Sequence, residues 1–374
     1  MPSVVPPRAS VDRAELTRTG ASASLAALRG HALELLPTVT AGYLETGAGD
    51  QGTVHLNTAD FERVRLAPHV LRDVAEVSTA TTLLGRRVAS PLAVAPVGAH
   101  GLFHPTAECG TASGADAAGL PMSLSAYSNT PIEQVARHTG AGVWAQINVP
   151  PDRQYLWGFL DRVQHCAEAV VITVDTPVVG ARESQVWDGL TLPDGLAYPM
   201  QDGLDPRSER GDSIYRSALD AGFTLSVLED VVERSPLPVI VKGFLRGDDA
   251  RAAVQAGAAA VIVSNHGGRN LDSGLSTIRA LPAVSAAVDG QVPVLIDGGI
   301  RRGTDILKAL ALGARGVLVG RPVMWGLTVG GADGVQHVLS TLKRELAMAM
   351  ALCGVRTVDD ITPDLIHDQQ WNSH

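Results

Sequence analysis

The sequence predicts an α/β protein built as a (β/α)8 TIM barrel, with an N-terminal helical extension and a long lid loop after the fourth strand. Two observations predict the barrel. From residue 91 onward, eight short and nearly continuous apolar runs follow one another, and an amphipathic segment follows most of them. Such runs are typical of parallel strands that helices cover on the outside. A doubly wound sheet is the alternative, but it rarely has so many units.

The eight predicted strands are residues 91–95, 121–125, 142–147, 169–174, 238–241, 259–264, 292–297 and 316–320. The clearest intervening helices are residues 248–258 and 303–314, where apolar residues recur at helical spacing. Before the barrel, spaced leucines predict a helix over residues 24–36, and Pro37 ends it. Residues 83–90 predict a short hairpin that leads into the barrel.

These elements divide the chain into a disordered tail (1–20), a helical cap with a hairpin (21–90), a (β/α)8 barrel (91–356) and a C-terminal tail (357–374). About sixty residues separate the fourth strand from the fifth, and they include the polar stretch 193–211. Long loops in compact domains are usually functional. We interpret this stretch as an active-site lid, and the alternative is a solvated insertion without a role.

Composition excludes several classes of protein. A net charge of −9 argues against a nucleic-acid partner, which requires a basic surface. Three scattered cysteines are too few for a disulfide framework or a zinc site, so we expect a reducing cytoplasm and no metal. The first residues lack the apolar core of a signal peptide, and no run reaches the roughly 18 apolar residues of a membrane span.

Polar residues and glycines gather where the predicted strands end. Barrel enzymes place their chemistry at the C-terminal ends of the strands. One buried polar residue is usually a satisfied core group, but repetition at six or more strand ends indicates a site. The residues are Ser125, Gln146, Asn148, Thr173, Asp175, Lys242, Ser264, His266, Arg269, Asp297, Gly298, Gly299, Gly320 and Arg321.

The ends of the last two strands predict a phosphate site. The segments IDGGIRRG and LVGRP supply glycines whose backbone N–H groups can approach an anion. Arg301 and Arg321 supply positive charge with fork geometry. The loops after strands 7 and 8 commonly bind phosphate in this fold, so the motif marks a phosphate-bearing ligand without identifying it.

The segment VSNHGGRNLD, after the sixth strand, predicts catalysis. His266 is a candidate general base, Arg269 can bind a carboxylate through two hydrogen bonds, and Asp175 can orient the imidazole. The alternative is that His266 caps a turn in a glycine-rich loop. Lys242 follows four apolar residues, so we expect it to face a ligand that gains negative charge, such as reduced FMN. Its alternative is to reach solvent at the rim.

Together these segments resemble the FMN-dependent 2-hydroxy-acid oxidase and dehydrogenase family, which includes glycolate oxidase, lactate oxidase and mandelate dehydrogenase. The motifs are SNHGGRNLD, DGGIRRGTD, TVDTP and VKG, and the resemblance runs from about residue 36 to residue 356. The segments PVGAHGLFHPT and SLSAYS look closest to the lactate oxidase branch. The resemblance implies FMN as cofactor, a small 2-hydroxy acid as substrate and a homotetramer.

The resemblance also implies a role for each matched residue. Tyr43 and Arg269 would bind the substrate carboxylate with Arg182 nearby, and His266 would be the base with Asp175 as its partner. The positions expected to contact FMN are Pro96, Val97, Gly98, Ser125, Gln146, Thr173, Lys242, Ser264, Asp297, Gly298, Gly299, Arg301, Gly320 and Arg321.

Two positions depart from the family pattern. Asn148 stands where many members have a substrate-contacting tyrosine, and Gly98 stands where alanine is frequent. Both changes would enlarge the pocket, so we expect a branched, aryl or carrier-linked acid larger than lactate or glycolate. Tyr127 could pack against such a group, or simply fill the barrel mouth.

Two other functions stay open at this point. A flavin barrel without net redox chemistry, such as an isomerase, would need the phosphate motif but not the pair of His266 and Arg269. The second open function is that of a catalytically inactive barrel that binds FMN, and Asn148 is the main support for it. No segment corresponds to the inserts by which some members attach to membranes or haem.

Overall fold

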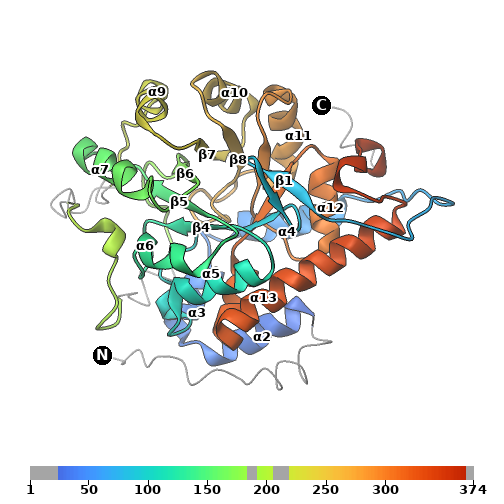
Figure 1. Cartoon of the computed structure of the whole chain (residues 1–374), viewed down its shortest axis with the longest axis horizontal. Helices are drawn as coiled ribbons and strands as arrows, with labels where there is room; N and C mark the ends of the chain where they lie inside the picture. Colours follow the sequence, from blue (N-terminus) through green and yellow to red (C-terminus); the bar gives the residue numbers. More distant parts are fainter. Residues whose placement is uncertain (1–23, 183–191, 205–218, 368–374) are drawn as a thin grey trace.

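A closed barrel of eight parallel strands lies at the centre of the molecule (Figure 1). The computed structural model describes residues 24–182, 192–204 and 219–367. The strands are paired in the order β10-β3-β4-β5-β6-β7-β8-β9, so each strand lies beside its neighbours in sequence and the last closes on the first. The predicted tail 1–20 lies outside the described residues.

The barrel strands are the eight predicted apolar runs. Their bounds are β3 (Leu92–Val94), β4 (Met122–Ser125), β5 (Val143–Asn148), β6 (Ala169–Thr173), β7 (Val239–Phe244), β8 (Ala260–Val263), β9 (Val294–Ile296) and β10 (Gly316–Val319). Nearly every residue in them is buried, because barrel side chains fill the inside and helices cover the outside. The (β/α)8 prediction is therefore confirmed.

One strand is longer than predicted, with a consequence for the site. The apolar run ends at Val241, but β7 continues through Lys242 to Phe244, with a register shift against β8 between these two residues. Gly243 lies at the shift with φ +130°, and a Cβ there would lie 2.7 Å from Cβ of Asp175. Glycine is thus required for Asp175 to approach β7.

Helices surround the barrel and extend it at the N-terminus. They are α2 (Leu25–Leu35), α3 (Thr38–Glu45), α4 (Gly52–Arg63), α5 (Ala107–Ala117), α6 (Ile132–Val135), α7 (Arg153–Val163), α9 (Leu225–Arg234), α10 (Gly247–Gln255), α11 (Thr277–Val288), α12 (Gly303–Ala311) and α13 (Arg321–Leu352). Short 3-10 helices are η1 (His100–Leu102), η2 (Ala136–His138), η3 (Pro199–Gln201), η5 (Val358–Asp360) and η6 (Pro363–Leu365). The predicted helix 24–36 is α2, whose N-cap Ser24 accepts a hydrogen bond from the Ala27 amide. The segment labelled α13 consists of two helices that meet at a kink at Gly330 and Gly331, and it runs beside α2 and α5 (Figure 1).

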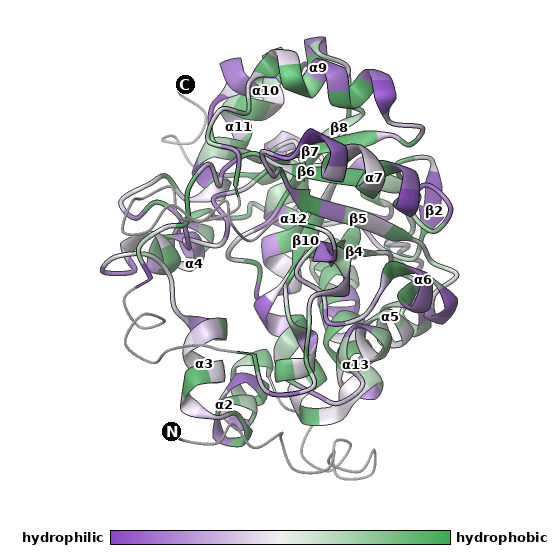
Figure 2. Ribbon diagram, turned by 90° about the vertical axis from the view of Figure 1, so that its left-hand side faces the viewer, coloured by the Kyte–Doolittle hydropathy of each residue, from purple (hydrophilic) through white to green (hydrophobic). Residues whose placement is uncertain are grey.

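A hairpin closes the N-terminal end of the barrel. Strands β1 (Thr81–Leu83) and β2 (Arg86–Val88) pair antiparallel, as predicted. Leu83 and Val88 pack against the apolar residues inside the barrel, among them Trp144 and Ile240. In the hydropathy view the barrel strand β8 is green, whereas β2 is largely purple because of its two arginines (Figure 2). Because apolar groups fill this end, polar side chains and ligand-sized space are left to the opposite end.

The C-terminal residues pack back onto the N-terminal extension. Leu365 and Ile366 are buried, Ile366 forms a bridge with Leu66, and the His367 amide donates to the Arg65 carbonyl at 2.9 Å. Residues 357–367 of the predicted C-terminal tail are therefore part of the packed structure. Among the helices in the described ranges, none combines the length and apolarity that crossing a membrane requires.

Candidate active site

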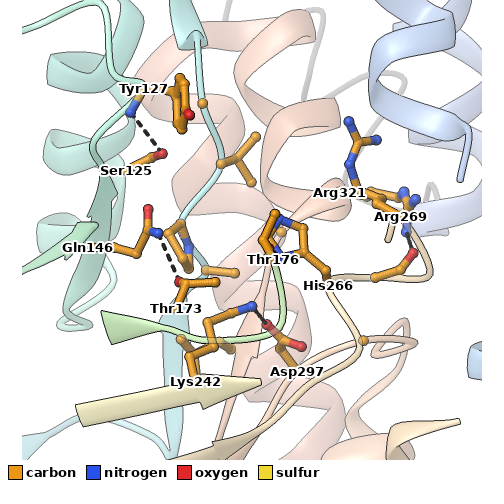
Figure 3. A pocket seen from close by; sticks show the side chains of 18 of the residues that line it. Ser125, Tyr127, Gln146, Thr173, Thr176, Lys242, His266, Arg269, Asp297 and Arg321 are labelled. Carbon is orange, nitrogen blue, oxygen red and sulfur yellow. Dashed lines mark hydrogen bonds and ion pairs between the residues drawn. The ribbon is translucent and has the colours of Figure 1, made fainter. Parts of the chain in front are cut away.

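A pocket opens where the barrel strands end, and it collects the residues predicted from the sequence. Figure 3 shows Gln146 and Thr173 on one side and Arg269 and Arg321 on the other. Of the predicted site residues, only Asp175 and Ser264 do not line the pocket, and each supports one that does. The pocket is lined by Tyr43, Pro96, Val97, Gly98, Ser125, Tyr127, Gln146, Asn148, Thr173, Arg182, Lys242, His266, Arg269, Asp297, Gly298, Gly299, Arg301, Gly320 and Arg321, with residues the sequence did not single out.

The imidazole of His266 is oriented by a carboxylate. Its Nδ1 lies 2.9 Å from Oδ1 of Asp175, so Nδ1 carries the proton and Nε2 is left with a lone pair. Burial lowers the pKa of His266 below 6.5 and outweighs the opposite effect of Asp175. Although burial raises the pKa of Asp175, the charges of His266 and Lys242 bring it down to about 2. A neutral histidine beside an ionised carboxylate is the arrangement that a general base requires.

Two further residues fix this pair, and the sequence analysis missed both. Thr176 Oγ1 lies 3.3 Å from His266 Nδ1 and donates to Asp175 Oδ1 at 3.1 Å. Asn270 Nδ2 donates to Thr176 Oγ1 at 2.7 Å and to the Asp175 carbonyl at 2.9 Å. Thr176 directly follows Asp175 in the sequence, and Asn270 directly follows Arg269. This position next to a predicted site residue is the signal that could have identified both.

The backbone at His266 is strained. His266 has φ +56°, and Gly267 and Gly268 follow with φ +67° and +76°. A residue with a side chain pays roughly 1–3 kcal/mol for a left-handed conformation, which persists only where surrounding contacts enforce it. The alternative that His266 merely caps a turn is not supported, because its side chain lines the pocket and faces Asp175.

Lys242 is buried with a carboxylate at the base of the pocket (Figure 3). Its Nζ lies 3.2 Å from Asp297 Oδ2 and donates to Ser264 Oγ at 2.8 Å. Burial lowers the pKa of Lys242, but the carboxylates of Asp297 and Asp175 raise it above its ordinary value. Lys242 is buried and lines the pocket, so it does not reach solvent at the rim, and that it faces a ligand gaining negative charge stays a prediction.

Arg182 and Arg269 place two positive charges beside Tyr43 on one side of the pocket. Arg269 Nη1 donates to the Tyr43 carbonyl at 2.7 Å and to the Thr46 carbonyl at 3.0 Å, and its Nε and Nη2 have no hydrogen-bond partner among the described residues. Arg182 Nε donates to the Arg269 carbonyl at 3.0 Å. Burial, followed by the charge of Arg269, lowers the pKa of Arg182 to about 10. Two half-buried cations that repel each other favour an anion between them.

The predicted phosphate residues also converge. Arg321 donates to the Leu44 carbonyl at 2.9 Å and to the Gly267 carbonyl at 3.1 Å. Burial, then the charges of Arg269 and Arg301, lower its pKa to about 9. Helix α13 begins beside Gly320, so its N-terminal amide groups add to the positive potential.

Gly298 and Gly299, in the predicted phosphate segment, are glycines for a structural reason that the sequence analysis did not give. Gly298 and Gly299 have φ +84° and +89°, and a Cβ on Gly299 would lie 1.9 Å from the Asn57 carbonyl oxygen. Glycine at 299 is therefore required by the close approach of α4.

Polar side chains of β4, β5 and β6 line the opposite side. Gln146 Nε2 donates to Thr173 Oγ1 at 2.8 Å and to Asn148 Oδ1 at 2.7 Å. Ser125 Oγ accepts from the Tyr127 amide at 3.1 Å. Asn148 thus lines the pocket, and its amide oxygen is held by Gln146.

Two tyrosines form an aromatic wall at the pocket mouth. Tyr127 and Tyr198 meet edge to face, with ring centroids 5.5 Å apart. The sequence analysis missed Tyr198, which lies in the predicted lid 193–211. Leu219, at the far end of the connection after β6, also lines the pocket.

The described part of the predicted lid is anchored to the barrel. The Ala197 carbonyl accepts from Asn129 Nδ2 at 2.9 Å, and the Pro199 carbonyl accepts from Arg162 Nη1 at 3.0 Å. Met200 is buried, and its carbonyl accepts from the Tyr155 hydroxyl. These contacts hold Tyr198 in place at the pocket. Residues 205–211 of the predicted lid lie outside the described residues.

Gly98 does not leave an empty space. A Cβ at this position would lie 3.0 Å from Cβ of Tyr127 and 3.2 Å from Oη of Tyr43. The Tyr43 hydroxyl donates to the Gly98 carbonyl at 3.4 Å. The room that a methyl group would need is thus taken by the two tyrosines.

Comparison with known proteins identifies relatives over nearly the whole chain. The family model described as FMN-dependent dehydrogenase matches residues 32–368. The L-lactate oxidase of Nostoc sp. is 42% identical over 337 residues, covering 87% of this chain and 92% of that protein. The peroxisomal (S)-2-hydroxy-acid oxidase of Oryza sativa subsp. japonica is 43% identical over 336 residues, covering 88% of this chain and 92% of that protein.

Solved structures of mandelate oxidase have the same fold. One superposes with a TM-score of 0.84 at 38% identity, covering 92% of this chain and 97% of that chain. A mutant of that enzyme has been solved with (S)-mandelic acid, and it superposes with a TM-score of 0.83 at 38% identity, covering 92% of this chain and 97% of that chain.

Proposed function

The chain belongs to the FMN-dependent dehydrogenase family, and from this premise we propose that it oxidises a 2-hydroxy acid to the 2-oxo acid with His266 as the base. It is a flavoprotein oxidoreductase with FMN as its cofactor. The observation that carries the proposal is the contact between His266 and Asp175 in the pocket that also contains Arg269 and Arg182. A base and an anion clamp in one pocket are what a 2-hydroxy acid requires.

The residues present fit FMN. Asp297 Oδ1 is buried without a hydrogen-bond partner among the described residues, so it can accept from a hydroxyl of the ribityl chain. Arg301, Arg321 and the start of α13 supply the charge that a phosphate needs. Pro96, Val97, Gly98, Ser125, Gln146 and Thr173 would contact the cofactor from the other strand ends. When bound, FMN accepts the two electrons that the hydroxy acid loses.

The chain's own residues would bind the substrate and move its proton. Arg269, Arg182 and the Tyr43 hydroxyl hold the carboxylate, which directs the α-carbon toward the remaining pocket. His266 Nε2 accepts a proton, and Asp175 stabilises the imidazolium that results. Lys242 keeps a fixed positive charge beside the electron acceptor, where it favours added negative charge without reorganisation.

The lining favours a substrate with a large apolar substituent. Asn148 stands in place of a bulky phenol, while Tyr127 and Tyr198 form an aromatic surface near it in the same pocket. Val179 and Leu219 add apolar area. These residues support an aryl or branched substituent, and a ring on the substrate could stack or meet the tyrosines edge to face.

Anaerobic titration of the FMN-loaded protein with a panel of 2-hydroxy acids tests the proposal. Bleaching of the flavin absorbance by an aryl or branched acid, at a higher rate than by lactate or glycolate, is the expected result. A non-redox isomerase or an inactive FMN-binding barrel would not be bleached by any acid. If glycolate or lactate is the best substrate, the proposal of a large substituent is wrong.

Two further proposals have narrower support. A homotetramer rests on the family resemblance, and sedimentation of the full chain tests it. A cytoplasmic location rests on the free cysteines Cys109, Cys166 and Cys353. Fractionation of the source cells tests it, and enrichment in peroxisomes, as the names of the plant relatives state for those proteins, would contradict it.

A further inference from the structure

Two buried asparagines outside the pocket contact each other through both amide groups. Asn57 lies on α4, and Asn265 lies directly before His266. Asn57 Nδ2 donates to Asn265 Oδ1 at 2.9 Å, and Asn265 Nδ2 donates to Asn57 Oδ1 at 2.8 Å. Their exposed fractions are 2% and 7%, and neither side chain lines the pocket.

The pair continues into the loop that carries His266. Asn265 Oδ1 also accepts from the Gly268 amide at 3.2 Å, and Asn265 Nδ2 also donates to the Leu275 carbonyl at 3.0 Å. Asn57 Oδ1 accepts from the Thr277 amide at 3.3 Å. The side-chain amide of Asn265 therefore holds the segment at Gly268 and Leu275, and that of Asn57 holds it at Thr277.

This segment contains the strained backbone of the site. His266 has φ +56°, and the two following glycines are also left-handed. The Gly268 amide, which Asn265 binds, is at the end of this left-handed run. Arg269 comes next, so the same hydrogen bonds set the direction of both the base and the carboxylate-binding arginine.

The pair reaches the predicted phosphate segment as well. A Cβ on Gly299 would lie 1.9 Å from the Asn57 carbonyl oxygen, and a Cβ on Gly298 would lie 3.4 Å from Asn57 Nδ2. Helix α4 thus touches two loops of the site through one residue.

We infer that the reciprocal amide pair of Asn57 and Asn265 is a positioning device for the proposed reaction, which holds His266 in its left-handed conformation with Nδ1 against Asp175. The inference rests on the proposed function, since it assigns the pair an effect on the base. An asparagine is suited to this because one amide supplies a donor and an acceptor at once. In a buried network, loss of one partner leaves the others unsatisfied.

The test compares Asn57→Ala with a matched control, Ser276→Ala. Ser276 Oγ donates to Asp60 Oδ2 at 2.5 Å, so the control removes a buried hydrogen bond from the same helix to the end of the same loop. We expect both variants to lose stability. Only Asn57→Ala should slow anaerobic flavin bleaching, on the order of 100-fold, because small displacements of a catalytic group are costly.

Three more measurements make the result decisive. The double variant Asn57→Ala with Asn265→Ala should be no slower than the slower single variant, because the two residues act as one unit. The pH profile of bleaching should change in Asn57→Ala and stay native in Ser276→Ala. If Asn57→Ala does not fold, Asn265→Asp keeps the acceptor for Asn57 and Gly268 but loses both donated bonds, and should be slowed in the same way.

A crystal structure of Asn57→Ala separates this inference from the proposed function. We expect the φ of His266 to leave its value of +56° and the contact of Nδ1 with Asp175 to lengthen beyond 2.9 Å. If no 2-hydroxy acid bleaches the native protein, the proposed function fails. The crystal structure of Asn57→Ala then tests by itself whether the amide pair holds His266 in position. An unchanged His266, or equal bleaching rates in Asn57→Ala and Ser276→Ala, would overturn the inference.

Discussion

Nδ1 of His266 lies 2.9 Å from Oδ1 of Asp175, and burial keeps the pKa of the imidazole below its ordinary value despite this contact. The base must be neutral to accept a proton. The rate of flavin bleaching should therefore decrease as the pH falls, with a midpoint below 6.5. Stopped-flow bleaching at a series of pH values measures this. A midpoint above pH 6.5 would show that Asp175 dominates instead.

Replacement of the base should separate catalysis from cofactor binding. His266→Gln removes the basic nitrogen but leaves Arg301, Arg321 and Asp297 in place. We expect FMN to remain bound and the bleaching rate to fall by about 10²–10⁴-fold, the usual contribution of proton-transfer catalysis. Near-native bleaching would mean that another group accepts the proton.

The buried pair of Lys242 and Asp297 predicts a stability effect that a double variant can reverse. Lys242→Met leaves Asp297 without its cation, which should reduce the free energy of unfolding by about 3–5 kcal/mol. Adding Asp297→Asn removes the unpaired charge and should restore most of that stability, although flavin bleaching should stay slow. Urea denaturation of the three proteins is the measurement. A double variant no more stable than Lys242→Met would contradict the assignment.

Arg321 predicts a preference for a phosphorylated flavin. Arg321→Ala should weaken binding of FMN more than binding of riboflavin, since only FMN carries the phosphate that the arginine would meet. Fluorescence titration with each flavin measures the ratio of the two affinities. Arg234→Ala is a suitable control, because Arg234 packs over Trp157 and does not line the pocket. Equal losses for both flavins in Arg321→Ala would place the phosphate elsewhere.

The two positions that depart from the family pattern should behave differently. Asn148→Tyr adds a phenol to the pocket and should slow bleaching by large acids relative to lactate. Gly98→Ala should instead weaken binding of every acid, because its methyl group would press on Tyr43 and Tyr127. Substrate titrations of both variants over one panel of acids compare these effects. A gain in small-acid selectivity in Gly98→Ala would contradict this account.

The strand ends could be predicted from the sequence because parallel strands bring their carboxyl ends to one edge. The predicted barrel order puts β6 and β8 on either side of β7, and this was enough to bring Asp175 near His266. Tyr198 could not be found in this way. Its place depends on hydrogen bonds from Asn129 and Arg162 to carbonyls of an irregular segment, which has no period to follow.

The contact between Asn57 and Asn265 could not be predicted from the sequence either. The two residues are 208 positions apart, and an asparagine on a helix is ordinarily taken for a surface residue. The reason for Gly299 was hidden too, because a glycine-rich loop suggests a ligand before it suggests a neighbouring helix. Contacts between the N-terminal extension and the barrel therefore had to come from the structure.

The hydrogen bond from Arg321 to the Leu44 carbonyl joins residues 277 positions apart, and this separation matters while the protein is being synthesised. At translation rates of about 5–20 residues per second, Leu44 is made roughly 14–55 s before Arg321. Helix α2 packs against α13, so it also lacks its partner until α13 has been synthesised. During that interval Leu25, Leu28 and Leu44 have no native surface to cover them. A nascent-chain chaperone that shelters the first helices should therefore raise the yield of soluble protein.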